Sequence, residues 1–251
     1  MKARILCVYD EGALEATPFI GAKGASMLIE VDGQRTLFGT GMRSRYLAHN
    51  MDHLEIDPES LDRVVVSHGH RDHVGGLGAV LSARRSPIGI LASPSSAGRK
   101  GPIRSHGIRI PSELADMARV GYVEDWTALS DNLHITPPLP FPGGDECFLV
   151  LTTADGPVVL SGCSHCGPEA VAETVRDRFG RDPRAYIGGL HIVRRDKVRA
   201  RAVAGFFRGI GCSDLRLNHC TCPAAITDIR GVLGSDAVGD FHVGMAVEYE
   251  V

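Results

Sequence analysis

The 251-residue sequence has few lysines and few aromatic residues. Its lysines are Lys2, Lys23, Lys100 and Lys197, it has one tryptophan, and aromatic residues make up 6 % of the chain. The formal net charge is −3. Such a chain has no overall basic field to attract nucleic acid or an anionic membrane, and it offers no stacking platform for single-stranded nucleic acid. We therefore expect neither nucleic acid nor a membrane as a partner.

Long apolar runs and targeting signals are also missing. No run approaches the ~20 apolar residues of a membrane span. The N-terminus, MKARILCVYDEGAL, reaches Asp10 and Glu11 before an apolar stretch of signal-peptide length develops. Seven cysteines are an odd number in a chain too large to need disulfides, which is typical of a reducing compartment. The sequence predicts a soluble, cytoplasmic protein. It contains no P-loop and no convincing dinucleotide-binding motif.

Strand-like runs alternate with helical patterns along the chain. Strands are expected at 3–9, 25–31, 35–38, 63–67, 86–93, 120–124, 132–136, 147–153, 157–162, 184–188, 213–217 and 241–249. Helices are expected at 74–84, 168–179, 196–209 and 223–233, with a short helix beginning at Asp57-Pro58. This alternation predicts an α/β protein of two halves packed as layers. Residues 93–112, rich in Ser, Gly and Pro, are expected to form a long inserted loop or lid.

The densest group of ligand-type side chains lies in VVVSHGHRDHVGGL, residues 64–77. In an extended chain, residues two apart point the same way, so His68, His70 and Asp72 can converge, and the following turn brings His73 beside them. The end of a buried strand is where α/β folds usually place their sites. Imidazole and carboxylate suit Zn²⁺, and also iron or manganese. Four such ligands in six residues predict two metal ions.

Three more histidines each follow an apolar strand-like run. They are His165 in VVLSGCSHCG, His191 in AYIGGLHIV and His219 in LRLNHCTCP. We predict that His165 and His219 complete the metal site. For His191 the pattern leaves open a ligand role, a supporting hydrogen bond or a contact with the substrate.

These motifs resemble a known family. SHGHRDHVGGL is similar to the signature loop of the metallo-β-lactamase superfamily, and MLIEVDGQRTLFGTG (27–41) resembles the strand pair that precedes it. The resemblance implies a single domain over 1–251, a four-layer αββα sandwich of two related halves, and a dinuclear site between the sheets. The chain departs from the family at Gly39, where an aspartate usually supports the metal loop.

The combination GCSH, GGLH and HCT resembles the branch that contains the 7,8-dihydropterin-6-methyl-4-(β-D-ribofuranosyl)aminobenzene 5′-phosphate synthases. Cys222 and Pro223 stand where that branch ordinarily continues with glycine. The resemblance implies that two divalent ions, Zn²⁺ first and Mn²⁺ or Fe²⁺ as alternatives, are held by two triplets of side chains. The first triplet is His68, His70 and His165, and the second is Asp72, His73 and His219.

The resemblance also bears on the chemistry. Relatives that handle dioxygen with two irons resemble this family but have glutamate at the position of His70. Imidazole at that position favours Lewis-acid chemistry, so we expect hydrolysis or displacement by a metal-dependent hydrolase or transferase. Asp72 would mainly bind metal and also orient the attacking hydroxide. Asp72 and His191 are the candidate catalytic residues.

The substrate is expected to be a small phosphorylated anion. Arg99, Arg104 and Arg109 of the insertion would bind its phosphate, because arginine binds phosphate through paired hydrogen bonds. Two other functions stay open, a phosphodiesterase or nuclease and a metal-dependent binding protein without catalysis.

The cysteines offer a rival site. Cys163-Ser-His-Cys166 and Cys220-Thr-Cys222 could together form a four-thiolate zinc or iron–sulfur site. Each pair flanks a histidine that is already assigned, so we favour free buried thiols, or a reactive pair near the metals.

Overall fold

The computed structural model describes residues 1–98 and 107–251. In this part of the chain, two mixed seven-stranded sheets face each other, and a two-stranded ribbon lies beside them. The first sheet has the order β16 (Ala246–Glu250), β1 (Lys2–Tyr9), β2 (Ser26–Val31), β3 (Gln34–Phe38), β4 (Arg63–Val66), β5 (Ile88–Ala92), β6 (Ala118–Tyr122). The second has the order β15 (Val238–Asp240), β14 (Asp214–Leu217), β13 (Ala185–Gly188), β12 (Val158–Ser161), β11 (Leu149–Leu151), β8 (Leu133–Ile135), β7 (Thr127–Ala128). The ribbon pairs β9 (Leu139–Phe141) with β10 (Gly144–Glu146).

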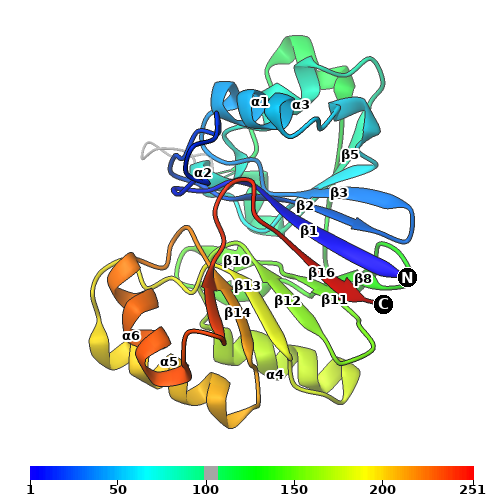
Figure 1. The fold of residues 1–251 in the computed structure, drawn as a ribbon. Coiled ribbons are helices and arrows are strands. Elements are labelled where there is room, and N and C mark those ends of the chain that lie inside the picture. The colour runs from blue at the N-terminus through cyan, green and yellow to red at the C-terminus, as the bar shows by residue number, and fades with distance from the viewer. Residues whose placement is uncertain (99–106) are drawn as a thin grey trace.

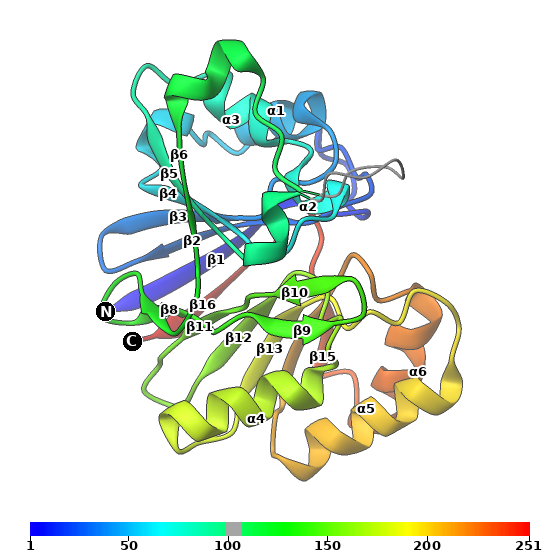
Figure 2. The same ribbon diagram turned by 180° about the vertical axis from the view of Figure 1, so that it is seen from behind.

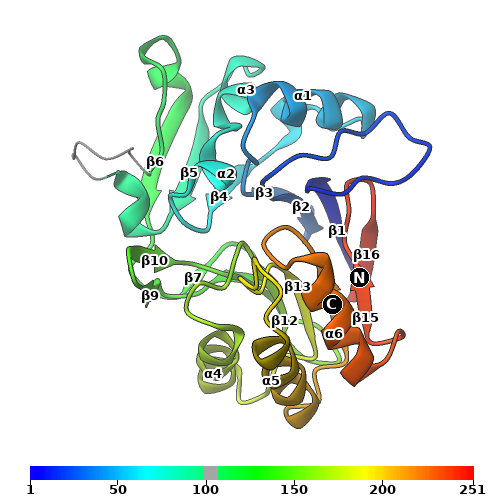
Figure 3. The same ribbon diagram turned by 90° about the vertical axis from the view of Figure 1, so that its left-hand side faces the viewer.

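Helices cover the outer faces of both sheets (Figure 1). On the first sheet they are α1 (Ser44–His53), α2 (Arg71–Val74) and α3 (Leu77–Ser82). On the second they are α4 (Pro168–Phe179), α5 (Lys197–Gly209) and α6 (Pro223–Leu233). Short 3-10 helices occupy Pro58–Ser60, Pro94–Ala97 and Ser112–Met117. The view from behind and the side view show the same helix–sheet–sheet–helix stacking (Figures 2 and 3). The predicted αββα sandwich is confirmed.

Alternation along the strands produces three apolar layers. In β1, Ile5 and Cys7 belong to the core between the sheets, whereas Leu6 and Val8 belong to the core under the helices of the first sheet. A third core lies between the second sheet and α4, α5 and α6. Because successive side chains of a strand point to opposite faces, each strand serves two layers.

The first and last strands pair with each other. Lys2 lies opposite Glu250 in the antiparallel β1–β16 ladder, so both ends of the chain lie side by side (Figure 1). The predicted strand at 241–249 is wrong in its bounds. The chain forms β15 at 238–240, turns, and then forms β16 at 246–250.

The predicted helix at 74–84 is interrupted at Gly75 and Gly76, between α2 and α3. A Cβ at Gly76 would lie 1.9 Å from the Thr40 carbonyl oxygen, and one at Gly75 would lie 2.4 Å from the carbonyl oxygen of Met42. The loop that follows β3 therefore packs directly on the glycine backbone. This contact positions the loop after β3, which supports the predicted metal-binding loop.

Helix α1 and the β9–β10 ribbon were not predicted. In α1 the buried residues are Leu47, Asn50 and Met51, which is too narrow an apolar stripe to stand out as helical periodicity. Of the predicted insertion at 93–112, residues 99–106 lie outside the described residues. In the described ranges no helix is both long and apolar enough to cross a bilayer.

Candidate metal centre

The His68–His73 segment lies between β4 and α2. His68 is fully buried, and its Nδ1 lies 2.9 Å from Ser67 Oγ. His68 Nε2 lies 3.1 Å from His70 Nδ1. His70 is the residue before the first turn of α2, and Asp72 and His73 belong to that turn. The change from extended to helical backbone aims the side chains into one space.

The first triplet is completed from the second sheet. His165 follows β12, and its Nε2 lies 3.3 Å from His68 Nε2. One nitrogen each from His68, His70 and His165 lies within 4.8 Å of the other two. Burial lowers the pKa of His68 well below its ordinary value and that of His165 to about 3. Both imidazoles are therefore neutral, the form that binds a metal.

The second triplet joins α2 to the loop after β14. Asp72, His73 and His219 each place one ligand atom within 4.8 Å of the others, and Asp72 Oδ2 lies 3.6 Å from His219 Nε2. His219 is buried, its Nδ1 lies 3.5 Å from Glu11 Oε1, and neither ring nitrogen makes a hydrogen bond of ordinary geometry to a described residue. Buried polar atoms without partners are costly, and a metal ion would satisfy one of them. The donor set thus fits a divalent cation.

Thr40 supports the metal loop where Gly39 departs from the family pattern. The main-chain N–H and the hydroxyl of Thr40 both donate to the His73 carbonyl oxygen, at 2.8 and 3.0 Å. Gly39 has φ 74°, and a Cβ there would lie 2.6 Å from the Ala25 carbonyl oxygen. An aspartate at 39 would strain this backbone. The loop is held instead by the next residue.

Glu146 is a supporting carboxylate that the sequence analysis missed. It is fully buried at the end of β10 and accepts the main-chain N–H groups of Cys163, Ser164 and His165 at 2.7, 3.2 and 2.9 Å. Its Oε1 also lies 3.6 Å from His68 Nδ1. Burial raises the pKa of Glu146 to about 7, although the N–H bonds oppose the rise. The only sequence signal is an acidic residue directly before the apolar run CFLVL.

Asp10 supports the opposite side of the site and was also missed. It is buried at the end of β1. It accepts the main-chain N–H groups of His219 and Gly12, each at 2.8 Å, and lies 3.0 Å from His242 Nδ1. Asp10 follows an apolar strand, as the predicted ligands do, and this was the signal available for finding it.

The loops after β12, β13 and β14 share an uncommon backbone conformation. Ser164, His191 and His219 have φ values of 62°, 50° and 47°. Left-handed non-glycine residues are uncommon, and they cluster at functional sites where surrounding contacts hold them. Parallel pairing of these three strands places the loops side by side.

A cavity of about 430 Å³ opens onto these groups. Its lining comprises Glu11, Lys23, His70, Asp72, Cys163, His165, His191, Val193, His219, Cys220, Cys222 and Pro223. Lys23 Nζ lies 3.7 Å from Asp72 Oδ2, and the exposed ring of His191 lies 4.0 Å from that of His165, centroid to centroid. A cavity of about 500 Å³ near α1 and α3 contains no histidine or cysteine, so the metal-site chemistry lies at the smaller cavity.

The predicted phosphate-binding arginines are placed only in part. Arg109 is exposed and does not belong to the cavity lining. Arg99 and Arg104 lie outside the described residues. Lys23 was not singled out from the sequence, because nothing near it in the chain marks a site.

The two cysteine pairs do not come together as a four-thiolate group in the described residues. Cys163 and Cys220 share a group of converging ligand atoms with His191, all within 4.8 Å. Cys166 and Cys222 belong to no such group among the described residues.

Comparison with known proteins agrees with the motifs and the fold. The model of the metallo-beta-lactamase superfamily matches residues 21–203, well over half of the chain. The chain belongs to the metallo-beta-lactamase superfamily. It is 26 % identical over 266 residues to 7,8-dihydropterin-6-methyl-4-(beta-D-ribofuranosyl)-aminobenzene-5′-phosphate synthase of Methanocaldococcus jannaschii, with 87 % of each chain covered.

Two solved structures share the superfamily fold over nearly the whole chain. A metal-dependent hydrolase of the beta-lactamase superfamily has a TM-score of 0.83 and 24 % identity, covering 99 % of this chain and 100 % of its own. The metallo-beta-lactamase fold protein YhfI from Bacillus subtilis has a TM-score of 0.68 and 14 % identity, covering 98 % and 99 %. The histidine and aspartate clusters are the candidate metal ligands of this superfamily member.

Proposed function

We propose that this superfamily member is a dinuclear metal enzyme that hydrolyses or displaces a phosphate or pyrophosphate group of a small anionic molecule. The observation that carries the proposal is the convergence of two ligand triplets drawn from both halves of the fold. Two members of each triplet, His70 and His165 of the first and Asp72 and His219 of the second, line one cavity. His68, His70 and His165 would hold one ion. Asp72, His73 and His219 would hold the other.

Zn²⁺ is the metal that we propose, because imidazoles make up most of both triplets. A divalent ion bound there would lower the pKa of water toward ~7 and withdraw charge from a phosphoryl oxygen. Asp72, which lines the cavity, would orient the attacking water as well as bind metal. His191 at the exposed rim would pass a proton to the leaving group. Lys23 would contact the anionic part of the substrate.

The size of the cavity supports a small-molecule substrate. A volume of about 430 Å³ falls in the range of sites for small ligands. The relative from Methanocaldococcus jannaschii is named for a product that carries a dihydropterin and a 5′-phosphate. We propose a dihydropterin pyrophosphate as the substrate. The attacking water, or a phosphorylated small molecule as second substrate, would form the new bond to the carbon that carries the pyrophosphate, and pyrophosphate would leave with the electrons of the broken C–O bond.

Metal content tests the proposal first. Purified wild-type protein and the His68→Ala, His165→Ala and His219→Ala variants are analysed by elemental mass spectrometry, with His49→Ala on α1 as the control. We expect two ions per wild-type chain and per control chain, and fewer in each site variant. One ion or none in wild type, or site variants that keep both ions, would overturn the dinuclear assignment.

Activity is then measured with the zinc-loaded protein. The substrates are simple phosphoesters and a dihydropterin pyrophosphate, and the readout is released phosphate or pyrophosphate. We expect turnover that the His219→Ala variant loses and the His49→Ala variant keeps. A protein that holds two ions but turns over none of these compounds would be a binding protein, and the proposed reaction would be wrong.

A further inference from the structure

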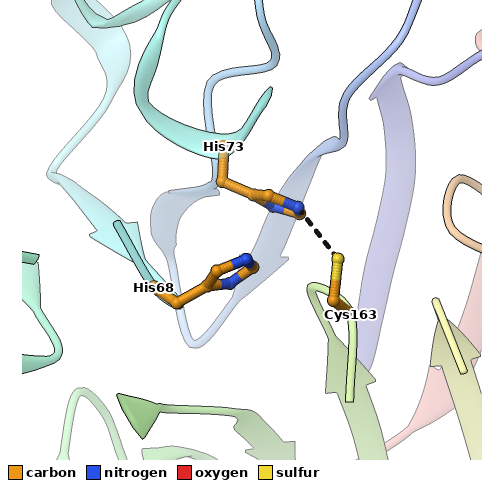
Figure 4. Close-up of side chains that lie close together, drawn as sticks. All are labelled: His68, His73 and Cys163. Atoms are coloured by element: carbon orange, nitrogen blue, oxygen red, sulfur yellow. Dashed lines mark hydrogen bonds between the residues drawn. The ribbon is translucent and has the colours of Figure 1, made fainter. Parts of the chain in front are cut away.

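Cys163 lies between the two ligand triplets. Its Sγ lies 3.2 Å from His73 Nε2, as Figure 4 shows. Ligand atoms of His68, His73 and Cys163 all lie within 4.8 Å of one another. His68 belongs to the first triplet and His73 to the second, so one buried sulfur is close to a ligand of each.

The separation between these atoms suits shared coordination. Zn–S bonds are about 2.3 Å and Zn–N bonds about 2.0–2.1 Å, so sulfur and nitrogen ligands on one tetrahedral ion lie roughly 3.5 Å apart. The observed 3.2 Å between Cys163 Sγ and His73 Nε2 is close to that spacing. A thiolate sulfur has several lone pairs and can bind two ions at once.

The neighbouring Cys220 is engaged differently. Its Sγ donates to the Cys163 carbonyl oxygen at 3.4 Å and accepts the main-chain N–H of His191 at 3.3 Å. These contacts tie the loop after β13 to the loop after β12. Cys220 therefore has a positioning role, whereas the sulfur of Cys163 points at the histidines (Figure 4).

We propose that Cys163 is a metal ligand whose thiolate bridges the ion of the His68 triplet and the ion of the His73 triplet. The inference rests on the proposed function, because it requires two ions, each of which would take the reacting water as a fifth ligand. Coordination removes the thiol proton, which passes to solvent. A soft thiolate ligand also favours Zn²⁺, Co²⁺ and Cd²⁺ over Mg²⁺ or Mn²⁺.

Cobalt substitution tests the bridge without an activity assay. Metal-free protein is titrated with Co²⁺, and thiolate-to-cobalt charge transfer is followed in the near ultraviolet. We expect two ions per wild-type chain, with a charge-transfer band that grows with both. Cys163→Ser should lose the band and weaken binding at least tenfold. Cys163→Asp should hold two ions without the band, since a carboxylate can also bridge. Cys220→Ser should keep the band, and so should Cys212→Ser, a control at a buried cysteine in the core between the second sheet and α4, α5 and α6, outside the converging ligand groups.

The outcomes separate the two proposals. Two bound cobalt ions with no charge-transfer band would overturn the bridge and leave the dinuclear site standing. A band that survives in Cys163→Ser but disappears in Cys220→Ser would also overturn it, in favour of Cys220. Failure of wild type to bind cobalt would count against the proposed function itself.

X-ray absorption of the zinc-loaded wild type gives a measurement that needs no variant to fold. We expect about one sulfur neighbour per zinc at about 2.3 Å. Nitrogen and oxygen neighbours alone would refute the bridge.

Discussion

Replacing Asp10 with alanine removes the acceptor of two main-chain N–H groups, those of Gly12 and His219, each 2.8 Å from the carboxylate. The N–H of His219 is buried, and the hydrogen bond from Gly12 is partly buried. The methyl group of alanine cannot accept a hydrogen bond from either N–H. Loss of the carboxylate also leaves a cavity between the end of β1 and the loop that contains His219. The left-handed backbone at His219 then loses the contact that holds it.

The expected cost follows from the donors left without a partner. A buried donor deprived of its acceptor costs about 1–3 kcal/mol, so two donors, one only partly buried, give about 2–5 kcal/mol. This is a large share of the ~5–15 kcal/mol by which proteins of this kind are stable. Asp10→Asn retains one acceptor oxygen, and about half of that loss is expected.

The assay is urea denaturation of the metal-free protein, with Asp52→Ala as the control. Asp52 lies on α1 with an exposed side chain, so its removal changes the net charge equally without leaving a buried donor. We also expect Asp10→Ala to weaken binding of the second ion by about 10–100-fold, as loss of outer-sphere support does in other metal sites. An Asp10→Ala protein within ~0.5 kcal/mol of the control, with unchanged metal affinity, would refute the reasoning.

Three further changes should behave as follows. Glu146→Ala leaves three main-chain N–H groups without an acceptor and should lower the free energy of unfolding by about 3–6 kcal/mol, measured by urea denaturation; a loss under ~1 kcal/mol would contradict this. Gly76→Ala should cost more than about 2 kcal/mol through its backbone clash, whereas Gly78→Ala, a neighbouring helical position with room for the methyl group, should be neutral or stabilising by up to ~1 kcal/mol; equal effects on the melting temperature would count against the clash. The hydrogen bond to Asp10 raises the pKa of His242 in the folded protein. The stabilisation that this interaction gives is therefore complete below the unfolded pKa of ~6.5, and it is lost as the pH rises through the higher folded pKa. Because His242 is partly exposed, the free energy of unfolding of wild type should be higher than that of His242→Gln by less than ~1 kcal/mol at pH 5.5. If this difference does not shrink by pH 8.5, the assignment is refuted.

Much of the fold could be predicted from the sequence, because the signals that mark its helices, strands and turns are local. The helix at 223–233 begins with proline after an extended residue and ends before glycine, and the hairpin at Asp32-Gly33 joins β2 to β3 with both residues at positive φ. Such features depend on neighbouring residues, so a short window of sequence contains them. Helix α1 was missed because its burial depends on the sheet below it and not on a strong pattern of its own.

The sequence by itself pointed to the six candidate ligands and to His191 as a seventh histidine of open role, because four of the ligands lie in one segment and three histidines follow apolar strands. Tertiary structure alone decided what holds and surrounds them. Glu146 accepts N–H groups 17 to 19 positions away, Asp10 accepts one 209 positions away, and Cys163 lies beside a histidine 90 positions before it. Contacts of this kind come from packing one sheet against the other, and a carboxylate or thiol in the sequence does not show which distant main-chain group or metal ligand it will meet.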